Sequence, residues 1–79
     1  MDDNRYDNFL KEFGKQVRLT RKERSMSMEA VAYKAGIEYR QLGRIERGEV
    51  NTTIISLLKI AEALEIDIKR FFDIQKNTK

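Results

Sequence analysis

The sequence contains no cysteine, no histidine and no proline, and it has only four glycines among its 79 residues. Without cysteine the fold has no disulfide bond, which suits a reducing cytosol. Without cysteine and histidine the chain also lacks the residues of Ser-His-Asp and Cys-His catalytic sites and the ligands of an ordinary structural zinc site. We therefore expect no metal, no cofactor and no enzymatic activity.

Membrane signals are missing as well. No apolar run reaches the roughly 18 residues that a membrane-spanning helix needs. The polar N-terminus, residues 1–5, does not have the pattern of a signal peptide. We expect a cytoplasmic protein that has no membrane partner.

The residues that are present favour an all-α fold. Leucine, isoleucine, alanine, glutamate and lysine are common, and helix-breaking residues are scarce. A chain of this length forms one small domain, residues 1–79, with a modest core over about residues 6–75 and disordered ends. The net charge of +3 is a mild excess, but its placement matters, because a local basic face can bind phosphates. Basic residues cluster at Lys11, Lys15, Arg18, Arg21, Lys22 and Arg24, and again at Arg40, Arg44 and Arg47.

Apolar spacing and capping residues predict five helices, over about residues 6–24, 28–35, 38 or 39 to 47, 53–64 and 68–75. The expected inward-facing residues of the first helix are Phe9, Leu10, Phe13 and Val17. Those of the fourth are Ile54, Leu57, Leu58, Ala61 and Leu64, and those of the fifth are Ile68, Phe71 and Phe72.

Residues 27–48 form the most informative segment. Ser27 is a good N-cap for the second helix, although Ala30 stands where a capping box would need Glu or Gln. Gly36 favours a left-handed turn before the third helix, and Gly48 ends that helix. Two short helices across a tight turn that contains glycine are typical of a helix-turn-helix, whose second helix can lie in the major groove of DNA.

The third helix has two faces. Leu42 and Ile45 are three residues apart and should be buried, whereas Arg40 and Arg44 are four apart on the other side. We place Gly43 on the exposed face, where it would let the helix approach a surface closely. The arginine fork matches the O6 and N7 acceptors of guanine. Two ordinary solvated arginines are the alternative interpretation, and the helix-turn-helix context favours base reading.

Residues 13–72 resemble the phage repressor and Cro-like (XRE-type) helix-turn-helix family. The matching pieces, in order, are Arg21, Ser27-Met28-Glu29-Ala30-Val31-Ala32, Ala35-Gly36-Ile37, Ile45-Glu46-Arg47-Gly48 and residues 57–64. The resemblance implies a compact five-helix lambda-repressor-like domain in which the second and third helices form the helix-turn-helix. It also implies a transcriptional regulator that reads operator half-sites in double-stranded DNA as a homodimer on the nucleoid. Such a dimer represses when it blocks RNA polymerase, which is the expected case, and activates when it contacts the polymerase instead.

The resemblance also implies residue roles. The base-reading positions are Tyr39, Arg40 and Arg44, and the phosphate-contacting positions are Ser27, Met28, Lys34 and Arg47. Arg21 and Glu46 match a buried ion pair, whereas the bare sequence would leave them as two solvated charges. The chain departs from the family pattern at Met28, where members often have Gln, at Glu38, where Ser or Thr is usual, and at Glu49, an acid after the closing glycine.

Self-association is expected through the last helix and the end of the fourth, at Ile66, Ile68, Phe71, Phe72 and Ile74. Adjacent helical residues point about 100° apart, so one of the two phenylalanines can face the core and the other a partner. The alternative function is a protein-interaction module, an antitoxin or adaptor, whose chief partner is another protein.

Overall fold

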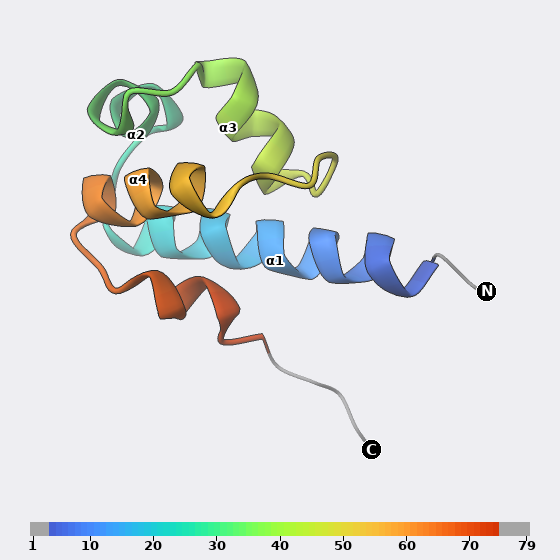
Figure 1. The fold of residues 1–79 in the computed structure, drawn as a ribbon. Helices are drawn as coiled ribbons and strands as arrows, with labels where there is room; N and C mark the ends of the chain where they lie inside the picture. Colours follow the sequence, from blue (N-terminus) through green and yellow to red (C-terminus); the bar gives the residue numbers. More distant parts are fainter. Residues whose placement is uncertain (1–3, 75–79) are drawn as a thin grey trace.

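The computed structural model describes residues 4–74, which form four α-helices and one short 3-10 helix (Figure 1). They are α1 (Asn4–Glu23), α2 (Met28–Ala35), α3 (Tyr39–Glu46), α4 (Ile54–Leu64) and the 3-10 helix η1 (Ile68–Phe72). Residues 4–74 contain no strand, so the all-α prediction is confirmed. The fifth predicted α-helix is wrong in type, because η1 is a 3-10 helix that ends at Phe72. Residue 75 and the tail at 76–79 lie outside the described residues.

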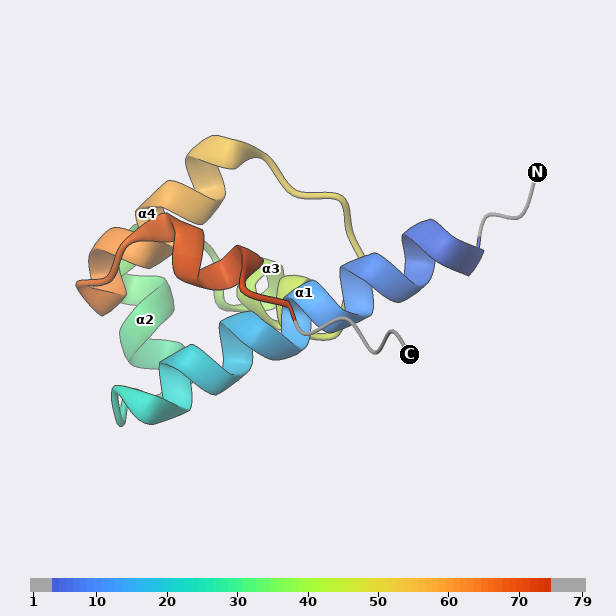
Figure 2. The same ribbon diagram turned by 90° about the horizontal axis from the view of Figure 1, so that it is seen from below.

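The long helix α1 is the element on which the others are assembled. It contacts α3 on one side and η1 on the other, while α2 packs against both α3 and α4 (Figure 1). In the view from below, η1 crosses between α4 and α1 (Figure 2). A helix of 20 residues is about 30 Å long, and α1 therefore sets the long axis of a molecule that measures 38 × 22 × 18 Å.

The core lies where these helices meet. Its fully buried side chains include Val17, Val31, Leu42, Ile60, Leu64 and Phe71. Four residues that we predicted to face inward are instead substantially exposed, namely Phe9, Ile54, Leu58 and Phe72. Phe9 lies on the N-terminal half of α1, and Ile54 is the first residue of α4, so both lie where few elements pack over them. No helix among residues 4–74 combines the length and apolarity needed to cross a bilayer.

The two C-terminal phenylalanines have different environments. Phe71 is completely buried, so of the two phenylalanines it is the one that faces the core, and it offers no surface to a dimer interface. Phe72 is 46% exposed and contacts Phe13, with 5.0 Å between the ring centroids. Ile66, Ile68 and Ile74 are partly buried and pack against the core. Of the predicted interface, Phe72 is the residue that offers the most apolar surface.

Glycine allows α1 and α3 to approach backbone to backbone. An added Cβ at Gly14 would lie 2.4 Å from the carbonyl oxygen of Ile45 and 2.5 Å from that of Glu46. A Cβ at Gly48 would lie 2.6 Å from the Cα of Lys11, and the φ angle of Gly48 is +72°. The C-terminal end of α3 therefore lies directly on α1, which fixes the position of the helix.

Capping defines the turn between α2 and α3. The Oγ of Ser27 accepts a hydrogen bond from the Ala30 N–H at 3.1 Å, as predicted for an N-cap. Gly36 has a left-handed backbone (φ 73°, ψ 32°), and the N–H of Ile37 donates to the Ala32 carbonyl. This closing pattern ends α2 and sends the chain into α3 within three residues.

Candidate nucleic-acid interface

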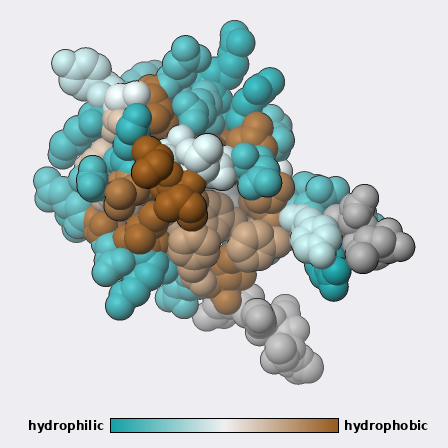
Figure 3. Space-filling model, in the orientation of Figure 1, coloured by the Kyte–Doolittle hydropathy of each residue, from teal (hydrophilic) through white to brown (hydrophobic). Residues whose placement is uncertain are grey.

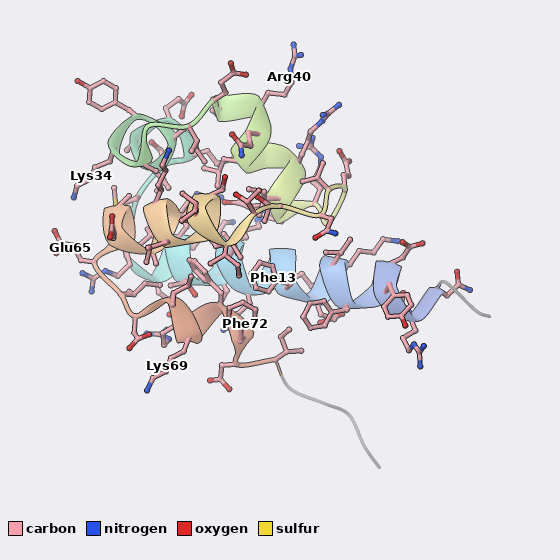
Figure 4. All side chains as sticks on the ribbon, viewed as in Figure 1. Phe13, Lys34, Arg40, Glu65, Lys69 and Phe72 are labelled. Carbon is pink, nitrogen blue, oxygen red and sulfur yellow. The ribbon has the colours of Figure 1, made fainter. Side chains whose placement is uncertain are left out.

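The helix α3 is anchored by one face and open on the other. Leu42 and Ile45 are buried, as predicted. Arg40 and Arg44 are exposed, and within residues 4–74 neither side chain makes a hydrogen bond or an ion pair. Figure 4 shows the Arg40 side chain pointing away from the body of the molecule. Two unpaired guanidinium groups thus lie one helical turn apart on a rigid support.

The first turn of α3 adds an aromatic side chain and an acid. Tyr39 is 52% exposed and begins the helix. Glu38 occupies the N-cap position with an extended backbone, but its side chain makes no capping hydrogen bond. Glu38 lines the same shallow groove as Arg40 and Arg44, and it therefore adds a negative charge at the edge of the basic face.

Replacement of Glu38 tests whether α3 lacks a cap. Serine at an N-cap accepts a backbone N–H, and this bond is worth about 1 kcal/mol. We expect Glu38→Ser to be more stable than Glu38→Ala by about that amount, because both variants remove the same carboxylate. Urea unfolding followed by circular dichroism measures the difference. Equal stability of the two variants would contradict the conclusion that the first turn of α3 has a backbone N–H that a capping side chain could bind.

Gly43 differs from the sequence prediction. We expected it on the exposed face, but it is buried. An added Cβ would lie 3.0 Å from Nη1 of Arg47 and 3.4 Å from Cε of Met28. The missing side chain makes room for Arg47, whose guanidinium lies across α3. Together with Arg18 these residues line a hollow of about 220 Å³.

Arg47 already has a partner within the chain. Its Nε lies 2.9 Å from Oε2 of Glu49 and its Nη2 lies 3.3 Å from Oε1. This hydrogen bonding raises the pKa of the Arg47 guanidinium and lowers the pKa of the Glu49 carboxyl. Both side chains remain more than half exposed, so the pair lies open to solvent.

The N-terminus of α2 faces the same hollow. Ser27 caps the helix with its hydroxyl, and the first backbone-to-backbone bond of the helix runs from the Val31 N–H to the Ser27 carbonyl. The N–H groups of Met28 and Glu29 precede that bond, so they have no helical carbonyl to which they can donate. Such free N–H groups, with the helix dipole, favour an anion. Met28 can contribute only its backbone to that contact.

Arg21 and Glu46 form an ion pair inside the molecule. Nε of Arg21 donates to Oε2 of Glu46 at 2.7 Å and Nη2 donates to Oε1 at 3.0 Å, while Nη1 donates to the Met26 carbonyl. The side chains are only 10% and 5% exposed. The hydrogen bond that Arg21 donates to Glu46 raises the pKa of the Arg21 guanidinium against the opposing effect of burial. The pair ties α1 to the end of α3.

Lys34 lies away from the other predicted contacts. Its Nζ is 3.6 Å from Oε2 of Glu65, and Arg24 also reaches Glu65 at 3.6 Å. Figure 4 shows Lys34 and Glu65 on one side of the molecule and Arg40 at its top. The predicted phosphate contact at Lys34 does not fit this placement. The Lys34 ammonium lies at the C-terminal end of α2, away from the N-terminal end, and it is paired with Glu65 at the end of α4.

The chain matches a known protein family over most of its length. Residues 17–71 match the helix-turn-helix family HTH_3. The chain belongs to the HTH_3 helix-turn-helix family.

Relatives of this HTH_3 chain include regulators from several bacteria. It is 33% identical over 61 residues to the HTH-type transcriptional regulator SlrR of Bacillus subtilis, a match that covers 76% of this chain and 40% of SlrR. The chain thus spans about two fifths of the length of that relative. The crystal structure of the restriction-modification controller protein C.AhdI from Aeromonas hydrophila is similar with a TM-score of 0.80 and 32% identity, covering 82% of this chain and 98% of C.AhdI. An HTH_3 family transcriptional regulator from Vibrio cholerae has a TM-score of 0.79 and 39% identity, covering 85% of this chain and 38% of that one.

The HTH_3 fold brings together residues to which the sequence assigned no role at the site. Asn51 and Thr52, in the loop before α4, line the groove that holds Arg40 and Arg44. Nε2 of Gln41 donates to Oγ of Ser56 at 3.2 Å, which joins α3 to α4. Arg18 reaches the hollow from α1. The polar run after Gly48 was a weak signal for the loop, but no spacing rule relates Arg18 to α3.

Proposed function

We propose that this chain is a sequence-specific regulator of transcription that binds double-stranded DNA through α3. The observation that carries the proposal is the exposed, unpaired state of Arg40 and Arg44 on a helix whose opposite face is anchored in the core. Membership in the HTH_3 family and the similarity to named transcriptional regulators support it. Such a regulator would act on the nucleoid in the cytoplasm.

The proposed contacts divide into two kinds. Backbone N–H groups at Met28 and the guanidinium of Arg47 engage phosphates and fix the register. Arg40 and Arg44 then hydrogen-bond to base edges, for which guanine offers the best match. Tyr39 supplies an apolar contact to a thymine methyl group or a hydrogen bond to a phosphate. Arg21 takes no part in DNA contact, because Glu46 and the Met26 carbonyl already occupy its donors.

We propose that two copies pair to read an inverted repeat and that the bound dimer represses transcription by blocking RNA polymerase. Figure 3 shows apolar side chains gathered in the middle of one face, over α4, η1 and the adjoining part of α1. The exposed members of these elements include Ile55 and Leu58 of α4 and Phe72 of η1. Ile66, Ile68 and Ile74 would border this surface. A second copy would cover apolar area that is otherwise in water.

Selection of duplexes from a randomised pool, followed by sequencing, tests the proposal. We expect the native chain to enrich an inverted repeat in moderate salt and the Arg40→Ala/Arg44→Ala variant to enrich none. Lys34→Ala/Lys69→Ala is the matched control, since it removes the same charge from side chains that point away from Arg40 (Figure 4). The control should enrich the native repeat.

The other outcomes are equally informative. A single half-site, rather than a repeat, would contradict paired reading. Weak binding that is independent of the DNA sequence and equal in all three proteins would contradict the role of α3 in base reading. In that case the exposed apolar surface of α4 and η1 would favour a protein-interaction module, an antitoxin or adaptor, as the function.

A further inference from the structure

Glu49 is held in place by the end of α3. Gly48 has a left-handed backbone, and the N–H of Glu49 donates to the Arg44 carbonyl at 2.9 Å, while the N–H of Gly48 donates to Ile45. This hydrogen-bonded turn closes the helix. The position of the Glu49 backbone is therefore fixed, two residues beyond Arg47 and across a rigid turn from it.

The position of this acid is unfavourable for the helix itself. The C-terminal end of a helix carries partial negative charge, so a carboxylate there is repelled and a cation is favoured. The helix dipole thus explains why a cation, Arg47, lies at the end of α3, but it does not explain the presence of the Glu49 carboxylate there. The Glu49 carboxylate instead makes two hydrogen bonds with Arg47, at 2.9 and 3.3 Å. Arg44 adds a weaker attraction, which also lowers the pKa of Glu49.

The carboxylate occupies the donors that a phosphate would use. Arginine presents a planar fork that takes either a carboxylate or a phosphate in the same two-bond manner. The Arg47 fork lies over Gly43 and beside Met28, in the hollow next to the N-terminus of α2. This is the place where the proposed function puts a DNA phosphate, so the two anions compete for one guanidinium.

We propose that Glu49 is an internal competitor for the DNA phosphate at Arg47. It weakens the sequence-independent part of binding, so that residence on DNA depends more on the base contacts of Arg40 and Arg44. The inference rests on the proposed DNA binding. It makes Glu49 a residue that sets the affinity for duplex DNA, although it contacts neither base nor phosphate.

Titration of binding with Glu49→Gln tests the competition. The probes are a duplex enriched by the native chain and a scrambled duplex of equal length. We expect Glu49→Gln to bind both duplexes more tightly by about three- to tenfold, because Arg47 is freed from an exposed ion pair and one negative charge is removed from the contact. The slope of log affinity against log salt should steepen by about one phosphate contact.

Glu23→Gln is the matched control for charge. Glu23 also forms an exposed pair with an arginine at 2.9 Å, but that pair joins α1 to η1 through Arg70. Its loss should change the affinity much less than Glu49→Gln does. In an Arg47→Ala background, Glu49→Gln should add no more than Glu23→Gln adds, because the contested guanidinium is gone.

The outcomes separate this inference from the proposed function. If the native chain binds duplex DNA and Glu49→Gln matches Glu23→Gln, the competition is wrong and DNA binding stands. If Glu49→Gln raised the affinity for DNA equally in the native and the Arg47→Ala backgrounds, the effect would come from net charge alone, and the inference would be wrong. If no duplex is bound with Glu49 or without it, both proposals fall together.

Discussion

Gly14→Ala should destabilise the domain by about 3 kcal/mol or more, a large part of its stability. Ordinary helix propensity predicts the opposite, since alanine is favoured over glycine within a helix by about 1 kcal/mol. The contact with α3 decides whether the substitution raises or lowers the stability of the domain. The new methyl group would lie 2.4 and 2.5 Å from two backbone carbonyl oxygens, at Ile45 and Glu46, and neither can rotate away as a side chain could. The helices must separate, which opens the core between them.

Urea unfolding of Gly14→Ala beside Gly36→Ala provides the measurement. Gly36 has a left-handed backbone, but an added Cβ there would meet nothing within 4 Å. Gly36→Ala should therefore cost only the backbone strain, about 1 kcal/mol. A small domain has about 5–10 kcal/mol of stability in total, so the two losses are easily told apart. A Gly14→Ala variant as stable as the native chain would refute the close packing of α1 on α3.

Glu46→Gln should destabilise the domain by about 3–5 kcal/mol, because it leaves the Arg21 charge buried without a counter-charge. The amide keeps the shape of the carboxylate, so the loss reports charge rather than packing. Nε and Nη2 of Arg21 both donate to Glu46, and its side chain is only 10% exposed. Water therefore cannot replace the lost carboxylate without opening the contact between α1 and α3.

The exposed pair of Glu23 and Arg70 supplies the control for this variant. Its distance of 2.9 Å is close to that of the buried pair, but its side chains are 46% and 51% exposed. Glu23→Gln should cost no more than about 1 kcal/mol. If Glu46→Gln cost as little, burial would not govern the energy of the Arg21 pair. Replacing both buried partners with apolar residues should recover much of the loss, since no isolated charge remains.

The sequence predicted the elements that depend on local signals. Ser27 as a cap, Gly36 as a left-handed turn and the buried face of Leu42 and Ile45 are all present, because each is set by neighbours within a few residues. The exposure of Arg40 followed from the same periodicity. These features were enough to place the helix-turn-helix and the side chains on its outer face.

The features that the sequence missed depend on contacts between distant segments. Gly14 is a helical glycine with no local signal, and only the approach of α3 gives it a role. Gly43 was assigned to the wrong face because the side chain of Arg47 folds over it. Lys34 was expected beside a phosphate, but Glu65 comes from the end of α4 to pair with it. These contacts join residues that are far apart in the sequence or depend on how a side chain folds, so no spacing rule predicts them.

Apart from the half-buried Gln41, which donates to Ser56, the residues of the helix α3 fall into two sets. Leu42, Gly43, Ile45 and Glu46 are buried against the rest of the fold, whereas Tyr39, Arg40 and Arg44 project into solvent. Surface changes away from special contacts usually alter stability by less than about 0.5 kcal/mol. Tyr39, Arg40 and Arg44 can therefore be randomised in a library with little risk of unfolded members. Under the proposed function, the domain is a scaffold whose target preference can be changed on this one face of α3 while the fold stays the same.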